Sequence, residues 1–468
     1  LELLIRKQIT QKKIKGYKFE VVGDAFTQFY DKHIPFELTG AQKRVLKEIR
    51  RDMQTGMHMN RLLQGDVGSG KTLVALMSML FAIGNGYQAC IMAPTEILAK
   101  QHFISIGDML SKMNINVSIL TGSTKKKDRK ILHEKLINGD IDILIGTHAL
   151  LEDPVKYKNL GIAIIDEQHR FGVAQRSKLW KKNNLPPHIL VMTATPIPRT
   201  LALTFYGDLD VSVIDELPPG RKSIETRHYF EASRLKVFKF IENEVKKGRQ
   251  VYIVYPLINE SEKLDYANLM DGFESITRRF PKPNYQVSIV NGKMKSEDKD
   301  YEMKLFTDGI TNIMVATTVI EVGVNVPNAS IMIIESAERF GLSQLHQLRG
   351  RVGRGSEQSY CVLMTGKKLS KGGKTRMETM VRTNDGFEIA EVDLNIRGPG
   401  DMEGTQQSGD LNFKLADLSK DVQIIQQARE QALEVLQFDP YLEDAQNKRT
   451  VNHLKKLFRY AGDWSKIS

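Results

Sequence analysis

The residues from Gly65 to Thr72 have the types and spacing of a phosphate-binding loop. They fit the pattern GxxxxGK[ST] at each position and lie between an apolar segment and a helix-forming one. Glycines let backbone N–H groups converge on phosphate oxygens at the positive end of the following helix. We expect Lys71 to contact the β- and γ-phosphates and Thr72 to bind Mg²⁺. The predicted nucleotide-binding residues of the loop are Gly65, Asp66, Val67, Gly68, Ser69, Gly70, Lys71 and Thr72.

Two acidic residues, Asp166 and Glu167, follow the apolar segment Ile162–Ile165. A buried parallel strand would place both carboxylates at the edge of its sheet. We expect Asp166 to hold Mg²⁺ through water and Glu167 to orient and deprotonate the attacking water. Paired acids after a strand often only begin a loop, but the phosphate-binding loop upstream favours the catalytic interpretation.

Two arginines near residue 350 are candidates for stabilising the transferred phosphoryl group. Negative charge grows on that group in the transition state, so cations stabilise it. An arginine supplied by a second domain would couple hydrolysis to closure of a cleft between domains. We predict this role for Arg351 and Arg354, with Arg354 preferred. A basic loop that binds DNA phosphates is the alternative.

Alternating β-rich and helix-forming segments must position these side chains. This alternation occurs twice and is typical of parallel sheets covered by helices on both faces. The first half has the strand candidates Arg61–Gln64, Cys90–Pro94, Val117–Leu120, Ile141–Gly146, Ile162–Asp166 and Ile189–Thr193. The second half has the strand candidates Val251–Tyr255, Val287–Val290, Ile313–Ala316, Ser330–Ile334 and Tyr360–Met364. We therefore predict an α/β chain with two parallel-sheet domains.

Prolines and the loss of strand signals predict the domain limits. Leu217–Arg221 contains paired prolines, which lack the backbone donors that helices and sheets need, so we predict a linker there. Strand signals stop after Gly372, where the helix candidates Lys374–Thr383 and Phe387–Ile396 and the loop Arg397–Gly409 follow. The predicted units are an amino-terminal helical or linker segment (1–34), two α/β domains (35–215 and 222–371) joined by a linker (216–221), a helical hairpin with its loop (372–412), and carboxy-terminal helices (413–468).

Composition and charge limit the class of protein. The 468 residues include 67 Lys and Arg against 56 Asp and Glu, and the net charge of +11 favours a polyanionic partner without identifying it. Cys90 and Cys361 stand far apart, which excludes a disulfide framework or a cysteine-rich zinc site and favours a reducing, cytosolic setting. The apolar run Leu73–Ile83 is shorter than the roughly 20 residues that span a membrane. Because residue 1 is Leu, we expect that an amino-terminal portion is missing.

The ordered motifs resemble those of superfamily-2 helicases over nearly the whole chain. Gln42 matches the adenine-reading residue ahead of the phosphate-binding loop, and Asp166–His169 matches a DEQH box. The resemblance implies two tandem RecA-like domains that use ATP and Mg²⁺. It implies motor coupling by Gln168, His169, Thr193, Ala194, Thr195 and Gln347. It implies contacts with nucleic acid for Thr95, Thr121, Gly122, Thr147, His148 and Thr317.

Longer stretches resemble the bacterial RecG family of branched-DNA helicases. These stretches are Gln168–Val173, Thr195–Thr200, Asp215–Arg221, Asp385–Leu394 and Arg397–Gly409. The last two resemble a translocation motif, in which a helical hairpin and loop turn motor closure into movement along duplex DNA. Within that motif, the implied translocation residues are Arg397 and Gln407.

The RecG resemblance implies an ATP-dependent DNA helicase and double-stranded DNA translocase. Its substrates would be branched double-stranded DNA, such as stalled replication forks and Holliday junctions, in recombination and repair. It implies a monomeric, cytoplasmic, nucleoid-associated bacterial protein with no membrane partner, and single-stranded-DNA-binding protein is a further candidate partner.

Three features depart from the family pattern. Too few residues precede Phe36 for the family's amino-terminal wedge, which splits branched DNA. Asn325 stands where the family usually has Asp, which would weaken a ribose contact, and Asn291 stands where relatives carry His.

Two other functions fit parts of the sequence. The motor of a transcription-repair coupling factor shares the motifs, but its polymerase-binding module would need more residues before Phe36. A nucleotide-gated DNA clamp would bind DNA without moving, and the presence of Lys71, Glu167 and Arg354 argues against it.

Overall fold

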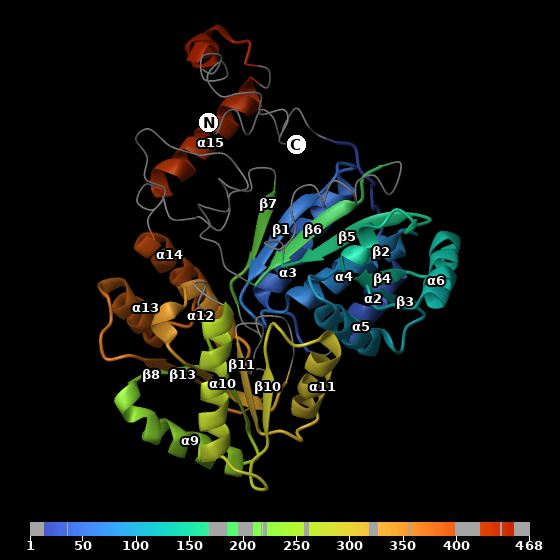
Figure 1. Cartoon of the computed structure of the whole chain (residues 1–468). Helices are drawn as coiled ribbons and strands as arrows, with labels where there is room; N and C mark the ends of the chain where they lie inside the picture. The colour runs from blue at the N-terminus through green and yellow to red at the C-terminus, as the bar shows by residue number, and fades with distance from the viewer. Residues whose placement is uncertain are drawn as a thin grey trace.

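Figure 1 shows the computed structural model of the chain, in which two α/β halves are followed by helices. The described residues are 14–34, 36–167, 185–194, 209–216, 218, 222–256, 262–317, 326–353, 355, 357–397, 422–439 and 442–453. None of the helices in these ranges has both the length and the apolar character of a membrane span.

Seven parallel strands form the first sheet, in the order β3-β4-β2-β5-β6-β1-β7. Their bounds are β1 (Asn60–Gly65), β2 (Gln88–Met92), β3 (Val117–Leu120), β4 (Ile143–Gly146), β5 (Leu160–Asp166), β6 (His188–Thr193) and β7 (Asp210–Ile214). Asp166 lies opposite Met192, and Gln64 lies opposite Thr193. This register brings the carboxyl ends of β5, β6 and β1 to one edge of the sheet.

Helices cover both faces of the first sheet. Successive side chains of a strand point to opposite faces, so Ile162 and Ile164 join one apolar cluster while Ala163 and Ile165 join the other. The helices of this half are α2 (Asp24–Gln28), the π-helix η1 (Phe29–His33), α3 (Gly40–Gln54), α4 (Lys71–Gly84), α5 (Glu96–Leu110), α6 (Lys126–Asn138) and the 3₁₀-helix η2 (His148–Leu151). Burial on both faces accounts for the continuous apolar runs that predicted these strands.

Six parallel strands form the second sheet, in the order β10-β11-β9-β12-β13-β8. Their bounds are β8 (Glu225–Phe230), β9 (Gln250–Tyr255), β10 (Val287–Val290), β11 (Ile313–Thr317), β12 (Ala329–Ile334) and β13 (Tyr360–Thr365). The helices of this half are α9 (Arg234–Lys246), α10 (Glu262–Arg279), α11 (Ser296–Thr307) and α12 (Leu342–Arg349), with the 3₁₀-helices η4 (Glu231–Ser233) and η6 (Ala337–Arg339). Two apolar clusters again lie on opposite faces of the sheet.

The carboxy-terminal helices include a hairpin beside the second sheet (Figure 1). It consists of α13 (Lys371–Arg382) and α14 (Gly386–Arg397), and α12 packs against both of these helices. Farther along the chain lie α15 (Val422–Phe438) and the 3₁₀-helix η7 (Ala445–Asn447). The two halves meet directly, and one contact is the ion pair between Lys100 of α5 and Asp300 of α11, at 3.3 Å.

The predicted fold class, two parallel-sheet α/β domains followed by a mainly helical element, is confirmed. Each strand candidate overlaps a strand of the structure, and the hairpin turns at the predicted break. In the predicted linker, residues 217 and 219–221 lie outside the described residues, as do residues 413–421 and 454–468 of the predicted carboxy-terminal helices.

Candidate nucleotide-binding and coupling site

The predicted phosphate-binding loop connects the end of β1 to the start of α4. Gly68 and Gly70 have φ values of 80° and 88°, a left-handed backbone that glycine adopts without a steric penalty. A Cβ atom added at Gly65 would lie 2.5 Å from Oγ of Ser69, and one added at Gly70 would overlap the side chain of Gln42. Glycine is therefore required here both for conformation and for close approach.

Lys71 lies across the inside of this loop. Its Nζ atom donates hydrogen bonds to the carbonyl oxygens of Gly65, at 2.7 Å, and Asp66, at 2.9 Å. An ammonium group has three N–H donors. Oγ of Ser69 is buried and has no hydrogen-bond partner among the described residues. The loop thus combines a cation, a buried hydroxyl and the amino end of a helix, which is a donor set suited to a phosphate group.

Gln42 connects α3 to the loop. Its Oε1 atom accepts from the backbone N–H of Thr39, at 3.0 Å, and its Nε2 atom donates to the carbonyl of Ser69, at 2.8 Å. Thr39 Oγ1 accepts from the N–H of Gln42, which completes a capping box at the start of α3. Gln42 is fully buried and supports the loop directly, and its predicted reading of adenine stays a prediction.

The predicted metal-binding residue Asp166 and the predicted catalytic base Glu167 lie at the end of β5. Asp166 is buried, and its Oδ2 atom lies 2.8 Å from Nε2 of His102 on α5. Glu167 has a φ of 55° and donates its N–H to the carbonyl of Met192, at 3.0 Å. A left-handed conformation is strained for a residue other than glycine, and such strain clusters at functional sites. His102 was not predicted, because a single histidine on a helix has no distinguishing sequence signal.

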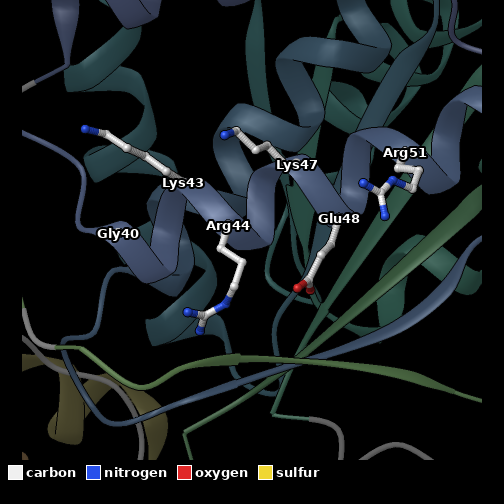
Figure 2. Close-up of a pocket in the computed structure, with 6 residues that line it drawn as sticks. All are labelled: Gly40, Lys43, Arg44, Lys47, Glu48 and Arg51. Atoms are coloured by element: carbon white, nitrogen blue, oxygen red, sulfur yellow. The ribbon is translucent and has the colours of Figure 1, made fainter.

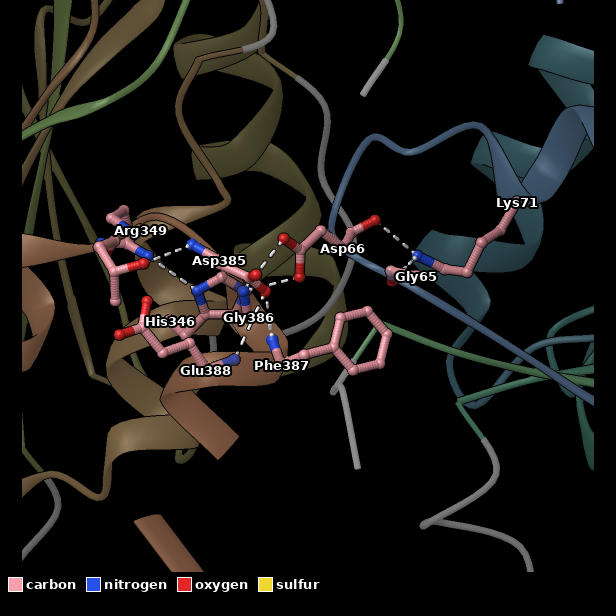
Figure 3. A network of polar contacts seen from close by, with 10 residues as sticks. Gly65, Asp66, Lys71, His346, Arg349, Asp385, Gly386, Phe387 and Glu388 are labelled. Carbon is pink, nitrogen blue, oxygen red and sulfur yellow. Dashed lines mark hydrogen bonds and ion pairs between the residues drawn. The ribbon is translucent and has the colours of Figure 1, made fainter. Parts of the chain in front are cut away.

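The second half brings α12 against the phosphate-binding loop (Figure 3). Nε2 of His346 lies 3.0 Å from Oδ1 of Asp66, and Nη2 of Arg349 lies 3.0 Å from Nδ1 of His346. A Cβ atom added at Gly350 would lie 2.8 Å from Cβ of Val67, so the two halves are in close contact here.

The same network continues into the hairpin. Nη1 of Arg349 donates to the carbonyls of Met380, at 2.9 Å, and Thr383, at 2.8 Å. The N–H of Gly386 donates to Oδ2 of Asp66, at 3.3 Å. Burial alone would raise the pKa of Asp66, but the hydrogen bond from His346, with the N–H of Gly386 and the charge of Lys71, brings the pKa below its ordinary value. Burial lowers the pKa of Arg349.

The structure describes one of the two arginines that were predicted to stabilise the transferred phosphoryl group. Arg351 lies two residues beyond the end of α12 and is buried, whereas Arg354 lies outside the described residues. The network instead uses His346 and Arg349, which flank Gln347 on α12. Residues three apart share a helix face, so the spacing predicts that His346 and Arg349 are neighbours but not that they contact Asp66.

The structure describes only some of the residues predicted to act in motor coupling and translocation. Thr193 is buried at the end of β6 and is followed by Ala194. Arg397 is the last residue of α14. The predicted residues outside the described ranges are Gln168, His169, Thr195, Arg354 and Gln407.

The structure brings two of the predicted nucleic-acid loops together. Thr95 caps α5 by accepting from the N–H of Leu98, at 3.4 Å. Glu96 then accepts from the N–H of Ser123, at 3.0 Å, and from its hydroxyl, at 2.8 Å. A Cβ atom added at Gly122 would lie 3.0 Å from the same carboxylate. The loops after β2 and β3 are therefore held as one unit.

The other predicted nucleic-acid residues also follow strands. Thr121 is buried directly after β3, and Thr147 is buried directly after β4. His148, the first residue of η2, is exposed. Thr317 is buried at the end of β11 in the second sheet. In open parallel sheets, ligands bind outside the carboxyl ends of the strands, and these residues lie there.

A separate hollow of about 400 Å³ lies along the outer face of α3 (Figure 2). The residues that line it are Gly40, Lys43, Arg44, Lys47, Glu48 and Arg51. Arg44 pairs with Asp215 at 2.8 Å, and Lys43 lies 3.5 Å from Glu37. These ion pairs neutralise part of the positive charge, and none of the predicted phosphate-binding residues lines this hollow.

Three segments of the chain match known families. Residues 39–204 match the DEAD/DEAH box helicase family, and residues 234–356 match the helicase conserved C-terminal domain. Residues 383–468 match the carboxy-terminal part of domain 3 of the ATP-dependent DNA helicase RecG.

Curated relatives match over most of the chain. It is 53% identical to the ATP-dependent DNA helicase RecG of Bacillus subtilis over 410 residues, which are 88% of this chain and 60% of that protein. It is 47% identical to the RecG helicase of Aquifex aeolicus over 475 residues, which cover 100% of this chain and 59% of that protein. The chain thus spans about three fifths of the length of these relatives.

Solved structures agree with the sequence matches. RecG bound to a three-way DNA junction matches with a TM-score of 0.75 and 43% sequence identity, covering 91% of this chain and 55% of that chain. The helicase MrfA bound to DNA matches with a TM-score of 0.58, covering 82% of this chain and 59% of that chain, and at 15% identity it shares the fold alone.

These matches and the two-domain geometry define the class: the chain has two tandem RecA-like domains that are similar to those of DEAD/DEAH box helicases. Within that class it is a relative of the RecG helicases over their motor and carboxy-terminal regions, and the resemblance predicted from the sequence is confirmed.

Proposed function

We propose that this chain is the motor of an ATP-dependent DNA helicase that moves along double-stranded DNA and remodels branched DNA. The observation that carries the proposal is the contact of the phosphate-binding loop, through Asp66, with both α12 and the hairpin. A nucleotide-binding loop that touches a hairpin matched by the RecG carboxy-terminal family has a direct route from ATP to the DNA-moving element.

In this proposal, Lys71 and the loop N–H groups bind the phosphates of ATP. Glu167 accepts the proton of the attacking water, and an arginine from the second half stabilises the charge that grows on the transferred phosphoryl group. Arg351 and Arg354 are the candidates for that arginine. Closure of the two halves would then be required for hydrolysis, because the cation and the base belong to different domains.

The donor set also fits Mg²⁺, which prefers oxygen ligands and retains several waters. Thr72 at the start of α4 and Asp166 at the end of β5 would hold it. Asp166 uses Oδ2 toward His102, and a carboxylate has a second oxygen that can accept from a metal-bound water. When bound, Mg²⁺ would neutralise charge on the β- and γ-phosphates.

The loops at the carboxyl ends of the strands would contact the DNA backbone. Phosphate contacts position a protein without reading sequence, which suits movement along any duplex. Arg397 and Gln407 would act with the hairpin in translocation. The named relatives are bacterial proteins, which supports a cytoplasmic, nucleoid-associated location. A monomeric state and contact with single-stranded-DNA-binding protein stay predictions of the family resemblance.

An ATPase assay with defined DNA tests this proposal. We expect a synthetic fork to stimulate hydrolysis more than a linear duplex of equal length, and we expect Lys71→Ala to lose about 100-fold or more of the stimulated rate with either DNA. Stimulation by neither DNA would contradict the proposal. Equal stimulation by fork and linear duplex would contradict branch recognition by this chain while leaving the motor assignment intact.

A further inference from the structure

A continuous chain of hydrogen bonds runs from the phosphate-binding loop to the hairpin (Figure 3). Its three side chains are Asp66 in the loop and His346 and Arg349 on α12. All three are largely buried, and Arg349 is only 1% exposed. Neither His346 nor Arg349 belongs to the set of residues to which the motifs assign a role. His346 is the middle member of these contacts, between Asp66 and Arg349.

The chemistry of the neighbours determines the proton positions on His346. The Arg349 guanidinium can only donate, so Nδ1 of His346 must accept from it. The Asp66 carboxylate can only accept, so Nε2 of His346 must carry the proton that it receives. A neutral imidazole with its hydrogen on Nε2 meets both requirements. Each ring nitrogen therefore makes a different hydrogen bond, and each of the two hydrogen bonds can be removed by a separate substitution.

Asp66 contacts the second half of the chain at two points. Oδ1 meets α12 through His346, and Oδ2 accepts from the N–H of Gly386 at the start of α14. Asp385 accepts from the next two N–H groups of that helix, at 2.8 and 3.4 Å. The positive end of α14 is thus held partly by a carboxylate of the phosphate-binding loop.

The backbone of Asp66 contacts Lys71 as well. Its carbonyl accepts from Lys71 Nζ, the group that the proposed function assigns to the phosphates of ATP. A phosphate that draws Lys71 away from this carbonyl changes the forces on Asp66, whose side chain is tied to α12 and α14. The same residue therefore faces the nucleotide through its backbone and the hairpin through its side chain.

We propose that His346 is a positioning residue that transmits the conformation of the phosphate-binding loop to the α13–α14 hairpin. On the far side, Arg349 binds the carbonyls of Met380 and Thr383, so it ties the end of α13 to α12. The inference rests on the proposed function for the use of this movement on DNA. The connection from loop to hairpin is a property of the protein alone.

Two substitutions of His346 each remove one of its two hydrogen bonds in the relay formed by Asp66, His346 and Arg349. His346→Asn places an acceptor oxygen near the position of Nδ1 and removes the donor toward Asp66. His346→Gln places a donor near the position of Nε2 and removes the acceptor for Arg349. Ser343→Ala is the matched control, because it deletes a different hydrogen bond between α12 and α14, from Ser343 to Asp393 at 3.0 Å.

The first measurement is backbone hydrogen exchange with and without a non-hydrolysable ATP analogue, in the absence of DNA. In the unmodified chain we expect the analogue to change exchange in residues 380–389 by about fivefold or more, a typical size for coupling between sites. Both His346 variants lose that change but keep the protection of residues 65–72, whereas Ser343→Ala behaves like the unmodified chain.

Three results would overturn the relay. They are a hairpin that does not respond to bound analogue in the unmodified chain, a full response in both His346 variants, and an equal loss in Ser343→Ala, which would indicate general loosening. Melting temperatures accompany each measurement, and either His346 variant suffices if the other fails to fold. Failure of DNA to stimulate hydrolysis would contradict the proposed function and leave this measurement unaffected.

Discussion

At the scale of single residues, some candidate site residues are identified by a sequence motif and others only by their contacts in the structure. The positions of the candidate phosphate-binding loop and of the acids after β5 could be predicted, because they depend on residue types at fixed spacing along one segment. His102, His346 and Arg349 could not, because their roles arise from contacts with Asp166 and Asp66 far away in the sequence. Tertiary neighbours of this kind leave no pattern in a single sequence.

Glu167→Gln separates nucleotide binding from hydrolysis. The amide keeps nearly the size of the carboxylate but cannot take a proton from water, so we expect turnover to fall by about 100-fold or more. A fluorescent ATP analogue should still bind with near-normal affinity. Glu134→Gln, at an exposed position of α6, is the control and should leave turnover unchanged. Normal hydrolysis by Glu167→Gln would remove this residue from the site.

His188 makes stability depend on pH. Its ring accepts from the N–H of Met59 and contacts the carbonyl of Tyr17, and burial, reinforced by His58, lowers its pKa from 6.5 to about 4. The unfolded chain binds the proton more readily. This stabilisation is therefore present above pH 6.5 and is lost as the pH falls toward 4, by on the order of 3 kcal/mol.

Urea unfolding at pH 7.5 and pH 5 measures this loss. His188→Asn should be less stable at pH 7.5 and should lose less stability on acidification than the unmodified chain. His453→Asn, at an exposed position, should retain the unmodified dependence. An identical pH dependence in His188→Asn and the unmodified chain would show that another group causes it.

At the scale of elements, buried strands were predictable, and of the four edge strands β3 and β10 were predicted whereas β7 and β8 were not. The central strands carry unbroken apolar runs because both of their faces are buried. Strands β7 and β8 were missed, and each lies at the edge of its sheet and is only partly buried. Their mixed polar and apolar residues reflect that exposure, so they lack the signal that identified the others.

Gly350→Ala tests the contact between α12 and the phosphate-binding loop. Gly350 has right-handed helical backbone angles, so alanine adds no backbone strain, but its Cβ atom would lie 2.8 Å from Val67. We expect a lower kcat for ATP hydrolysis with little change in melting temperature, because the loop and α12 must separate slightly. Gly366→Ala, where the nearest atom is 3.7 Å away, is the control. Unchanged kinetics in Gly350→Ala would show that this close approach is not needed for turnover.

At the scale of the whole molecule, one network of hydrogen bonds connects the two α/β halves and the hairpin. The phosphate-binding loop follows β1 of the first sheet, α12 of the second half contacts it through His346, and the hairpin packs against α12. The fold and this order were predictable from motifs and periodicity. The direct contact of Asp66 with the hairpin was not, because it depends on how the two halves sit together.

Displacement of a third strand tests most directly whether this chain moves along duplex DNA. A triplex-forming oligonucleotide bound to a linear duplex should be displaced by this chain in the presence of ATP and Mg²⁺. Lys71→Ala and Glu167→Gln should leave it bound. DNA-stimulated hydrolysis without displacement would contradict translocation and would identify the chain as a nucleotide-gated clamp.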